Sequence, residues 1–246
     1  MISDTNNNPE ERAILVVPTY NEAQSIGRLV SCVFELFPAI KILVVDDNSP
    51  DGTADVVKKL QDSNPNLHLM VRKIKDGLGN AYKAGFEKVF TDFPQSEVVM
   101  MIDADFYHDP TCIKTFLDKI KSVDLVIGSS QAGLVGIYKY RILLSRWANF
   151  YCRTIFGYPL RDWTNAFLAI RVPILKKVVQ VMPPFIRQFS ITYAVRYIAL
   201  RKGATYEEFE IPFTGLRQEG VSKMKLSTIL EGVVAPWKLR FSPFKK

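Results

Sequence analysis

Short apolar runs of strand length alternate with helix-type segments through the first half of the chain. The runs are rich in β-branched residues and lie at 13–17, 41–45, 67–71, 98–102 and 124–128. Helical patterns fill the intervals near 22–36, 53–62, 79–90 and 111–121. Runs this short and uniformly apolar are typical of parallel strands covered on both faces. The alternation therefore predicts an α/β fold with a Rossmann-like, doubly wound, mostly parallel sheet, which binds ligands at the carboxyl ends of its strands.

Polar segments rich in carboxylates follow three of the expected strands. They read PTYNE at 18–22, DDNSPDGT at 46–53 and DAD at 103–105. Neither a GxGxxG turn nor a Walker loop is present, which argues against a dinucleotide enzyme and a P-loop NTPase. Carboxylates repel phosphate unless a cation stands between them, so a phosphate-bearing ligand at this rim calls for a divalent metal.

The second half is less regular. Residues 139–156 predict an amphipathic helix, a β-type run follows at 205–212, and a last helix is expected near 224–240. One helix stripe carries Trp147 and Tyr151 with their apolar neighbours, and another carries Arg141, Ser145, Asn149 and Arg153. We expect a disordered tail at 1–12, one domain at 13–223 that includes the 139–156 helix as an amphipathic helical appendage, and a basic C-terminal helix and tail at 224–246.

The net charge of +7 is concentrated in the second half. Residues 130–161 carry five basic residues and no acid, and residues 217–246 carry seven basic residues against two acids. This distribution favours an anionic partner, either phosphate, nucleic acid or a membrane surface, with solvated helix faces as the competing explanation. Nucleic acid is disfavoured because no recognition helix, RNP-type motif or zinc pattern appears.

The sequence gives weak evidence on location. No apolar stretch reaches the ~18–20 residues that span a bilayer, and the polar, Asn-rich start predicts no secretory signal. Cys32, Cys112 and Cys152 lie far apart without metal-type spacing, so we interpret them as reduced thiols of a cytosolic protein.

An ordered series of motifs runs from about residue 14 to residue 223. The series is PTYNE, VVDDNSPDGT, GLGNAYKAGF, DAD, RDWTNAFLAIR and GVSK. It resembles the family 2 glycosyltransferases of the GT-A fold, and among them it is most similar to those that transfer mannose to dolichyl or polyprenyl phosphate. Each motif is weak alone, whereas their order and spacing together are specific.

The resemblance implies a nucleotide-sugar site, with GDP-mannose as the favoured donor. The matching nucleotide-pocket residues are Pro18, Tyr20, Glu22, Asp46 and Asp47. Asp103, Ala104 and Asp105 match the donor and metal motif, with Asp103 and Asp105 as ligands of Mg²⁺ or Mn²⁺ and Asp105 as a catalytic residue. The competing interpretation makes one of these acids a helix N-cap, a role that Asp109 and Thr111 also suit. For Asp51 to Thr53 we expect only a turn and an N-cap at Thr53.

The resemblance also implies an acceptor-phosphate site in the basic half. The matching residues are Arg141, Ser145, Arg217, Ser222 and Lys223, of which Arg217 and Lys223 are expected to be catalytic. A polyprenyl phosphate is already anionic at neutral pH, with a second pKa of about 6. Its oxygen needs no strong base, and cationic side chains screen the repulsion between the two anionic substrates. Asp162 and Thr164 match a site-shaping motif.

The sequence departs from the family pattern at several positions. Ser130 stands where relatives carry a phosphate-facing Arg, and Ala194 stands where they carry Glu. Asn165 and Ala166 replace Ser and Gly, while Tyr107 replaces a Gln or Ser that precedes the loop residue His108.

Several functional alternatives remain open at this point. They are a UDP-glucose donor, a saccharide, lipid or protein hydroxyl as acceptor, and a catalytically silent membrane-associated binding subunit. The leading hypothesis is an inverting hexosyltransferase that is peripheral on the cytosolic face of a membrane. A membrane-spanning subunit is a candidate partner. The 139–156 helix and the basic C-terminus have the composition of interfacial segments. The competing interpretation packs Trp147 into the core.

Overall fold

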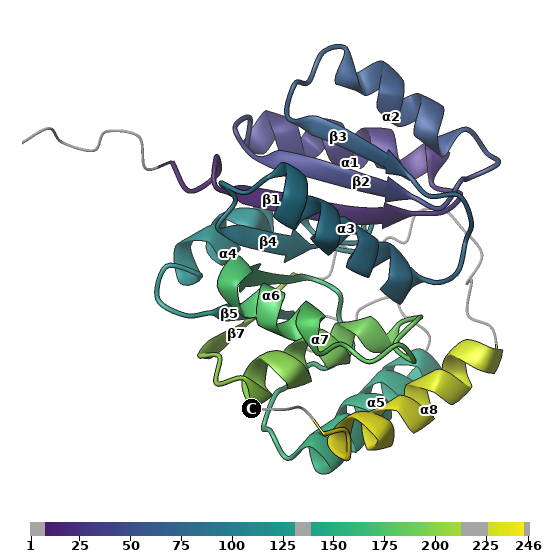
Figure 1. The fold of residues 1–246 in the computed structure, drawn as a ribbon, viewed down its shortest axis with the longest axis vertical. Coiled ribbons are helices and arrows are strands. Elements are labelled where there is room, and N and C mark those ends of the chain that lie inside the picture. The colour runs from purple at the N-terminus through teal and green to yellow at the C-terminus, as the bar shows by residue number, and fades with distance from the viewer. Residues whose placement is uncertain (1–7, 131–138, 213–225, 244–246) are drawn as a thin grey trace, which may run out of the picture.

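A computed structural model describes residues 8–130, 139–212 and 226–243. Within these residues, seven strands form one sheet in the order β3-β2-β1-β4-β6-β5-β7 (Figure 1). The strands are β1 (Ala13–Thr19), β2 (Lys41–Asp46), β3 (Leu67–Val71), β4 (Val98–Met101), β5 (Leu125–Ser129), β6 (Leu168–Arg171) and β7 (Tyr206–Glu210). All five expected strands of the first half are present, and their ends agree with the sequence to within two residues.

Most strand pairs are parallel. β1 pairs with β2 and β4 in parallel, β2 with β3, and β5 with β7. The sequence did not predict β6, which lies antiparallel between β4 and β5. The expected α/β class with a doubly wound, mostly parallel sheet is therefore confirmed, with one reversed strand.

Helices cover both faces of the sheet. They are α1 (Ala23–Leu36), α2 (Thr53–Gln61), α3 (Leu78–Asp92), α4 (Ile113–Lys119), α5 (Lys139–Phe156), α6 (Val172–Gln180), α7 (Ser190–Arg201) and α8 (Leu226–Arg240), with a 3₁₀ turn η1 (Pro110–Cys112) before α4. Alternating residues of β1 face opposite layers: Ile14 and Val16 pack with α3, α6 and α7, whereas Leu15 and Val17 pack with α1, α2 and α4. The sheet therefore separates two apolar cores.

Helix α5 forms where the sequence predicted it, and it buries one face in the core. Cys152 and Phe156 face the core, and so does Asn149, whose Oδ1 accepts a hydrogen bond from Trp163 N at 2.6 Å. Trp147 is 50% exposed and stacks on Tyr151. The competing interpretation that made Trp147 a core residue is therefore wrong. Helix α8 lies beside α5 (Figure 1), and Tyr151 Oη donates to the carbonyl of Val233 at 2.7 Å.

The first residues that the structure describes form turns ahead of β1. Residues 8–12, within the expected N-terminal tail, approach the start of β4, where Arg12 Nη1 pairs with Glu97 Oε1 at 2.6 Å. Residues 1–7 lie outside the described part of the chain.

We predict that Gly85→Ala destabilises the fold, although alanine normally favours a helix. A Cβ at Gly85 in α3 would lie 2.7 Å from Val16 Cγ1 and 3.1 Å from Val45 Cγ2, both on stiff, buried β-branched side chains. We expect a loss of about 1–3 kcal/mol in the free energy of unfolding, measured by urea denaturation.

Gly27→Ala in α1 is the matched control, because its Cβ would meet Val56 only at 3.6 Å. The free energy of unfolding of this variant should rise by up to about 1 kcal/mol, because alanine has a higher helix propensity than glycine. Equal effects of the two substitutions would contradict the close packing of α3 on the sheet.

Candidate active site

Three loops meet at one edge of the sheet. Strands β2, β1 and β4 are adjacent and parallel, so the loops that follow them leave from the same side. These loops contain the predicted donor and metal residues at 18–22, 46–53 and 103–108. The topology therefore brings together the carboxylate-rich segments that the sequence placed at the ends of separate strands.

Asp46 fastens the first two loops to each other. It is fully buried, and its carboxylate accepts hydrogen bonds from Thr19 Oγ1 at 2.8 Å, Ser49 N at 2.8 Å and Ser49 Oγ at 2.6 Å. Pro18 is likewise buried, at the end of β1. The side chains of both residues are buried inside the protein, so we interpret them as supports for the loops of the predicted nucleotide pocket.

Asp47 belongs to a chain of charged groups at the end of β3. Arg72 Nη1 lies 2.6 Å from Asp47 Oδ1, and the same guanidinium pairs with Asp76. Burial raises the pKa of Asp47 to about 6, despite the opposing effect of Arg72; Asp76 and Asp46 add to the rise. Arg72 was not predicted, and only its position directly after an expected strand could have drawn attention to it.

The turn before α2 ties the second loop to α1. Asp51 Oδ1 accepts hydrogen bonds from Thr53 N and Thr53 Oγ1, and Asp51 Oδ2 accepts from Ala23 N. Burial alone would raise the pKa of Asp51, but these hydrogen bonds lower it below its usual value. Gly52, with φ of 85°, occupies the N-cap position instead of Thr53. The predicted turn is present, and the expected N-cap at Thr53 is wrong.

Tyr20 and Glu22 lie in the loop after β1, at the predicted nucleotide pocket. The Tyr20 ring carries the ammonium of Lys75 over its face, 3.3 Å from the ring centroid. Glu22 precedes α1; its backbone N donates to Thr53 Oγ1 at 3.0 Å and its carboxylate accepts from Ser25 Oγ at 2.8 Å. A cation held on an aromatic face at this edge is a favourable surrounding for a diphosphate.

The DAD segment follows β4. Asp103 and Asp105 are partly exposed, whereas Ala104 is buried against the apolar core. Tyr107 N donates to Asp105 Oδ1 at 3.1 Å, across a turn in which Phe106 has a φ of 59°. The helix that follows is capped by Asp109, whose Oδ1 accepts from Thr111 N at 2.9 Å. Neither DAD carboxylate therefore serves as the N-cap.

The oxygen donors of Asp103 and Asp105 suit Mg²⁺ or Mn²⁺, which prefer carboxylate ligands. The described residues contain no group of three or more His, Cys, Asp or Glu side chains arranged to hold a metal. Mg²⁺ is commonly held by one or two carboxylates together with substrate phosphates. The pair therefore fits a cation that arrives with a diphosphate.

The pKa values of Tyr82 and Tyr107 are both affected by the nearby carboxylates. Burial raises the pKa of Tyr82 well above its usual value, and the charges of Asp103 and Asp105 act in the same direction. Burial also raises the pKa of Tyr107; Ser130 opposes this through a hydrogen bond, while Asp162, Asp105 and Asp103 add to it. The Asp162 loop therefore lies in the same electrostatic neighbourhood as the DAD segment.

Asp162 is a buried hub of hydrogen bonds. Its Oδ2 accepts from Ser130 N and Ser130 Oγ, both at 3.2 Å, while its Oδ1 accepts from Thr164 N at 3.0 Å and Asn165 N at 3.1 Å. Thr164 Oγ1 also contacts Oδ1, at 3.1 Å. From the β7 side, Glu208 accepts from the backbone N of Arg161. This geometry supports the site-shaping role suggested for Asp162 and Thr164.

Arg196 lies fully buried beneath this loop and was not predicted. Its Nη1 donates to the carbonyl of Thr192 at 2.7 Å, and its Nη2 donates to the carbonyl of Asn165. Burial lowers the pKa of Arg196 to about 10, and the charges of Asp162 and Glu208 oppose that shift. A lone arginine in the apolar run of α7 was the only available sequence signal.

The predicted acceptor residues are mostly beyond the described structure. Arg217, Ser222 and Lys223 lie outside the described residues, as does the side chain of Arg141 at the start of α5. Ser145 is described and half-buried on α5. The α5–α8 pair exposes large apolar side chains, namely Leu143, Leu144, Trp147 and Phe150 of α5 and Leu230, Val233, Val234 and Trp237 of α8, together with Phe241 directly after α8.

Helix α8 is tied to the donor side of the sheet. Glu231 accepts hydrogen bonds from Gln188 N at 2.9 Å and from Ser190 Oγ at the start of α7. The neighbouring Arg187 carbonyl accepts from Gly79 N at 2.8 Å. A Cβ at Gly77, whose φ is 121°, would lie 2.2 Å from that carbonyl oxygen. This contact accounts for glycine at 77.

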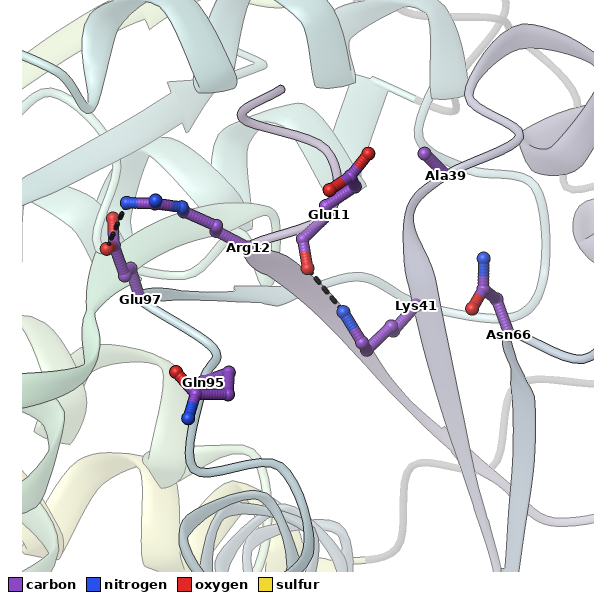
Figure 2. A pocket seen from close by; sticks show the side chains of 7 residues that line it. All are labelled: Glu11, Arg12, Ala39, Lys41, Asn66, Gln95 and Glu97. Atoms are coloured by element: carbon purple, nitrogen blue, oxygen red, sulfur yellow. Dashed lines mark hydrogen bonds and ion pairs between the residues drawn. The ribbon is translucent and has the colours of Figure 1, made fainter. Parts of the chain in front are cut away.

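A separate pocket of about 580 Å³ opens at the opposite edge of the sheet (Figure 2). It lies where β1, β2, β3 and β4 begin, and Figure 2 shows interactions between some of its lining residues. Arg12 pairs with Glu97, and Lys41 Nζ donates to the carbonyl of Glu11. These internal pairs leave the carboxylate edge as the better candidate for the active site.

Comparison with solved structures defines the class of protein. The chain aligns with glucosyl-3-phosphoglycerate synthase from Mycobacterium tuberculosis, crystallised with Mn²⁺, UDP and phosphoglyceric acid, at a TM-score of 0.63 and 15% identity, covering 93% of this chain and 78% of that one. Mannosyl-3-phosphoglycerate synthase from Rubrobacter xylanophilus aligns at a TM-score of 0.58 and 17% identity, covering 92% and 72%. The fold is that of the GT-A glycosyltransferases, as the sequence predicted.

Residues 14–179 match the glycosyl transferase family 2, and the chain therefore belongs to that family. It is 35% identical over 239 residues to the polyprenol monophosphomannose synthase of Mycolicibacterium smegmatis, covering 94% of this chain and 89% of that protein. It is 32% identical over 232 residues to the undecaprenyl-phosphate mannosyltransferase of Micrococcus luteus, covering 91% of each. The expected family and enzyme class, a glycosyltransferase, are confirmed.

Among the described residues, no helix combines the length and the apolar character needed to cross a bilayer.

We predict that the raised pKa of Asp47 makes the stability of the protein depend on pH. The folded carboxyl titrates near 6, whereas an unfolded Asp titrates near 3.9. The folded state therefore binds this proton more tightly, and protonation favours folding as the pH falls from above 6 towards 4.

Urea denaturation of the wild type and Asp47→Asn at pH 7 and pH 4.5 measures this effect. On going from pH 7 to pH 4.5, the free energy of unfolding of the wild type should rise by on the order of 1–3 kcal/mol relative to that of Asp47→Asn. A difference between the two proteins that stays constant with pH would contradict the assignment.

Proposed function

We propose that this chain is an inverting mannosyltransferase that uses a nucleotide sugar, with GDP-mannose as the favoured donor, and a polyprenyl phosphate such as dolichyl phosphate as acceptor. The observation that carries the proposal is the 35% identity to a polyprenol monophosphomannose synthase along 94% of the chain. The carboxylate edge of the sheet supports it, since it gathers oxygen ligands and charged groups where α/β sheets bind substrates.

The donor half of the site uses the loops after β1, β2 and β4. Asp47 is held by Arg72, so its remaining acceptor capacity points to hydrogen bonds with base or ribose donors. Asp46 and Pro18 hold the pocket in shape, while Tyr20 and Glu22 border it. Ala104 lies between the two acids that face the sugar diphosphate.

We assign Asp103 and Asp105 to a Mg²⁺ or Mn²⁺ ion that binds with the donor. When bound, such a cation supplies electrostatic stabilisation of the diphosphate that leaves the sugar. The role of the two carboxylates is to bind and orient that cation and, through it, the donor. The carboxylate of Asp105 is held in place by a hydrogen bond from the backbone N of Tyr107.

The acceptor half calls for positive charge. A phosphate oxygen of the polyprenyl phosphate attacks the anomeric carbon as the bond from that carbon to the diphosphate oxygen breaks, and the nucleoside diphosphate leaves with the electron pair. Attack opposite the leaving group inverts the configuration. The nucleophile is already ionised, so Arg141, Ser145, Arg217, Ser222 and Lys223 are assigned to binding and screening it, with Arg217 and Lys223 acting at the reacting phosphate.

We place the protein at the cytosolic face of a membrane, as a peripheral protein. The acceptor's apolar tail stays in the bilayer, so the active site must reach the surface. The exposed apolar residues of α5 and α8 are flanked by basic side chains such as Arg146 and Lys238, a composition suited to the membrane interface. Residues 13–223 form the catalytic domain and residues 224–246 the basic C-terminal segment, next to which a membrane-spanning partner subunit could bind.

The first test is transfer by the purified protein. We predict that [¹⁴C]mannose moves from GDP-mannose to undecaprenyl phosphate in the presence of Mn²⁺, and that Asp105→Asn lowers the rate at least about 100-fold while the thermal melting temperature stays the same. The transition-state interaction is lost, whereas the partly exposed carboxylate contributes little to the core.

Parallel reactions with UDP-glucose and with a free prenol identify the alternatives. Transfer that is faster from UDP-glucose, or transfer to the free hydroxyl, would replace the proposed substrate. Release of GDP without the lipid phosphate, or no turnover with either donor, would refute the proposal.

Liposome flotation tests the membrane surface. We predict that the protein floats with vesicles containing anionic lipid, that binding weakens as salt rises, and that Trp147→Ser with Phe241→Ser reduces the bound fraction at least threefold. Exposed aromatic and basic side chains contribute together at an anionic interface.

Ile74→Ser is the matched control, because Ile74 is 67% exposed in the loop after β3 and belongs to neither α5 nor α8. A similar loss of flotation in this control, or binding that is insensitive to anionic lipid and salt, would contradict the assignment.

A further inference from the structure

His108 is the least explained polar side chain near the DAD segment. It is 1% exposed, and neither ring nitrogen has a hydrogen-bond partner among the described residues. A buried imidazole without a partner is unfavourable, because it loses its hydrogen bonds to water and regains none. Such an arrangement calls for a partner that is present when the protein works.

Packing fixes where the His108 ring points. The ring lies against Phe167, with centroids 5.2 Å apart, and meets the edge of Tyr107 at 5.0 Å. The Phe106 turn, with a positive φ of 59°, folds the segment back on itself. The ring therefore packs between Phe167, which directly precedes β6, and Tyr107 of its own loop.

His108 lies close to the carboxylate of Asp103. His108 Nε2 lies 3.6 Å from Asp103 Oδ2, beyond hydrogen-bonding distance but within reach of a small side-chain rotation. The Asp103 side chain is 32% exposed, so one side of its carboxylate faces His108 and the rest faces solvent. That carboxylate can accept a hydrogen bond from the ring and bind a cation with its remaining lone pairs.

We propose that His108 is a positioning residue for Asp103: Nε2–H donates to Asp103 Oδ2 and orients the carboxylate toward the divalent cation. The inference rests on the proposed function, which assigns that cation to Asp103 and Asp105. Hydrogen bonds from buried neighbours commonly fix metal-binding side chains, and their loss typically weakens metal binding by about 10–100-fold. Mg²⁺ and Mn²⁺ favour oxygen ligands, so the imidazole supports the carboxylate instead of replacing it.

The test measures Mn²⁺ affinity directly, by electron paramagnetic resonance of free Mn²⁺ in the presence of GDP. His108→Phe keeps the ring packing on Phe167 and removes the donor, so it should weaken Mn²⁺ binding about 10–100-fold. His108→Gln restores an N–H donor and should recover part of the affinity. Thermal melting without metal checks that each variant is folded.

His68→Phe is the matched control. His68 is the other histidine of the chain; it lies on β3, with its ring 4.6 Å from that of Phe93. This substitution should leave Mn²⁺ affinity unchanged. If His108→Phe does not fold, the comparison between wild type, His108→Gln and His108→Asn carries the test, with Asn expected to bind more weakly because its shorter amide does not reach Asp103.

The outcomes separate this inference from the function on which it rests. Wild-type protein that binds no Mn²⁺ with GDP would overturn the metal assignment and this inference with it. Equal Mn²⁺ affinity in wild type and His108→Phe would overturn the role of His108 alone. Electron spin-echo modulation from a directly bonded ¹⁴N that disappears in His108→Phe would make His108 a metal ligand and would also overturn the positioning role.

Discussion

The reversed strand β6 is the constraint on which the site depends. Because β6 runs antiparallel to β4, with Leu168 opposite Met101, the loop that leads into β6 enters at the edge where the DAD segment leaves. That loop carries Asp162 and Thr164, more than 55 residues from Asp103 in sequence. A parallel strand in this place would have carried the same residues to the far edge. The direction of a four-residue strand thus joins the second half of the chain to the donor edge.

Two of the positions that the resemblance marks as departures from the family pattern lie in one connected region. Ser130 donates its hydroxyl to Asp162, and the backbone carbonyl of Asn165 accepts from Arg196. Ala194, on the same helix as Arg196, is buried in the apolar core. Ser130 and Asn165, which are far apart in sequence, therefore belong to the hydrogen-bond network around one buried acid and one buried base. Replacing a side chain in such a network affects every neighbour that depends on its hydrogen bonds.

The sequence predicted the parts of the fold that have a simple period. Runs such as 41–45 became β2 because uniform burial between helices requires apolar residues on both faces. β6 and α7 were missed for opposite reasons: β6 has only four residues, and α7 is buried on nearly all sides, so it shows no polar stripe. The direction in which a side chain points also could not be predicted from the sequence pattern. Asp46 and Asp47 are adjacent acids, yet one binds its own loop and the other pairs with Arg72.

The α5–α8 pair is more closely joined to the sheet than a helical appendage would be. Cys152 and Phe156 of α5 belong to the same apolar core as Ala235 and Leu239 of α8. Glu231 of α8 binds the start of α7, and the adjoining Arg187 carbonyl holds Gly79 at the start of α3. Few contacts therefore separate the exposed apolar surface from the loops around the donor edge. In the proposed function, this arrangement keeps the surface assigned to the membrane in fixed register with the site of sugar transfer.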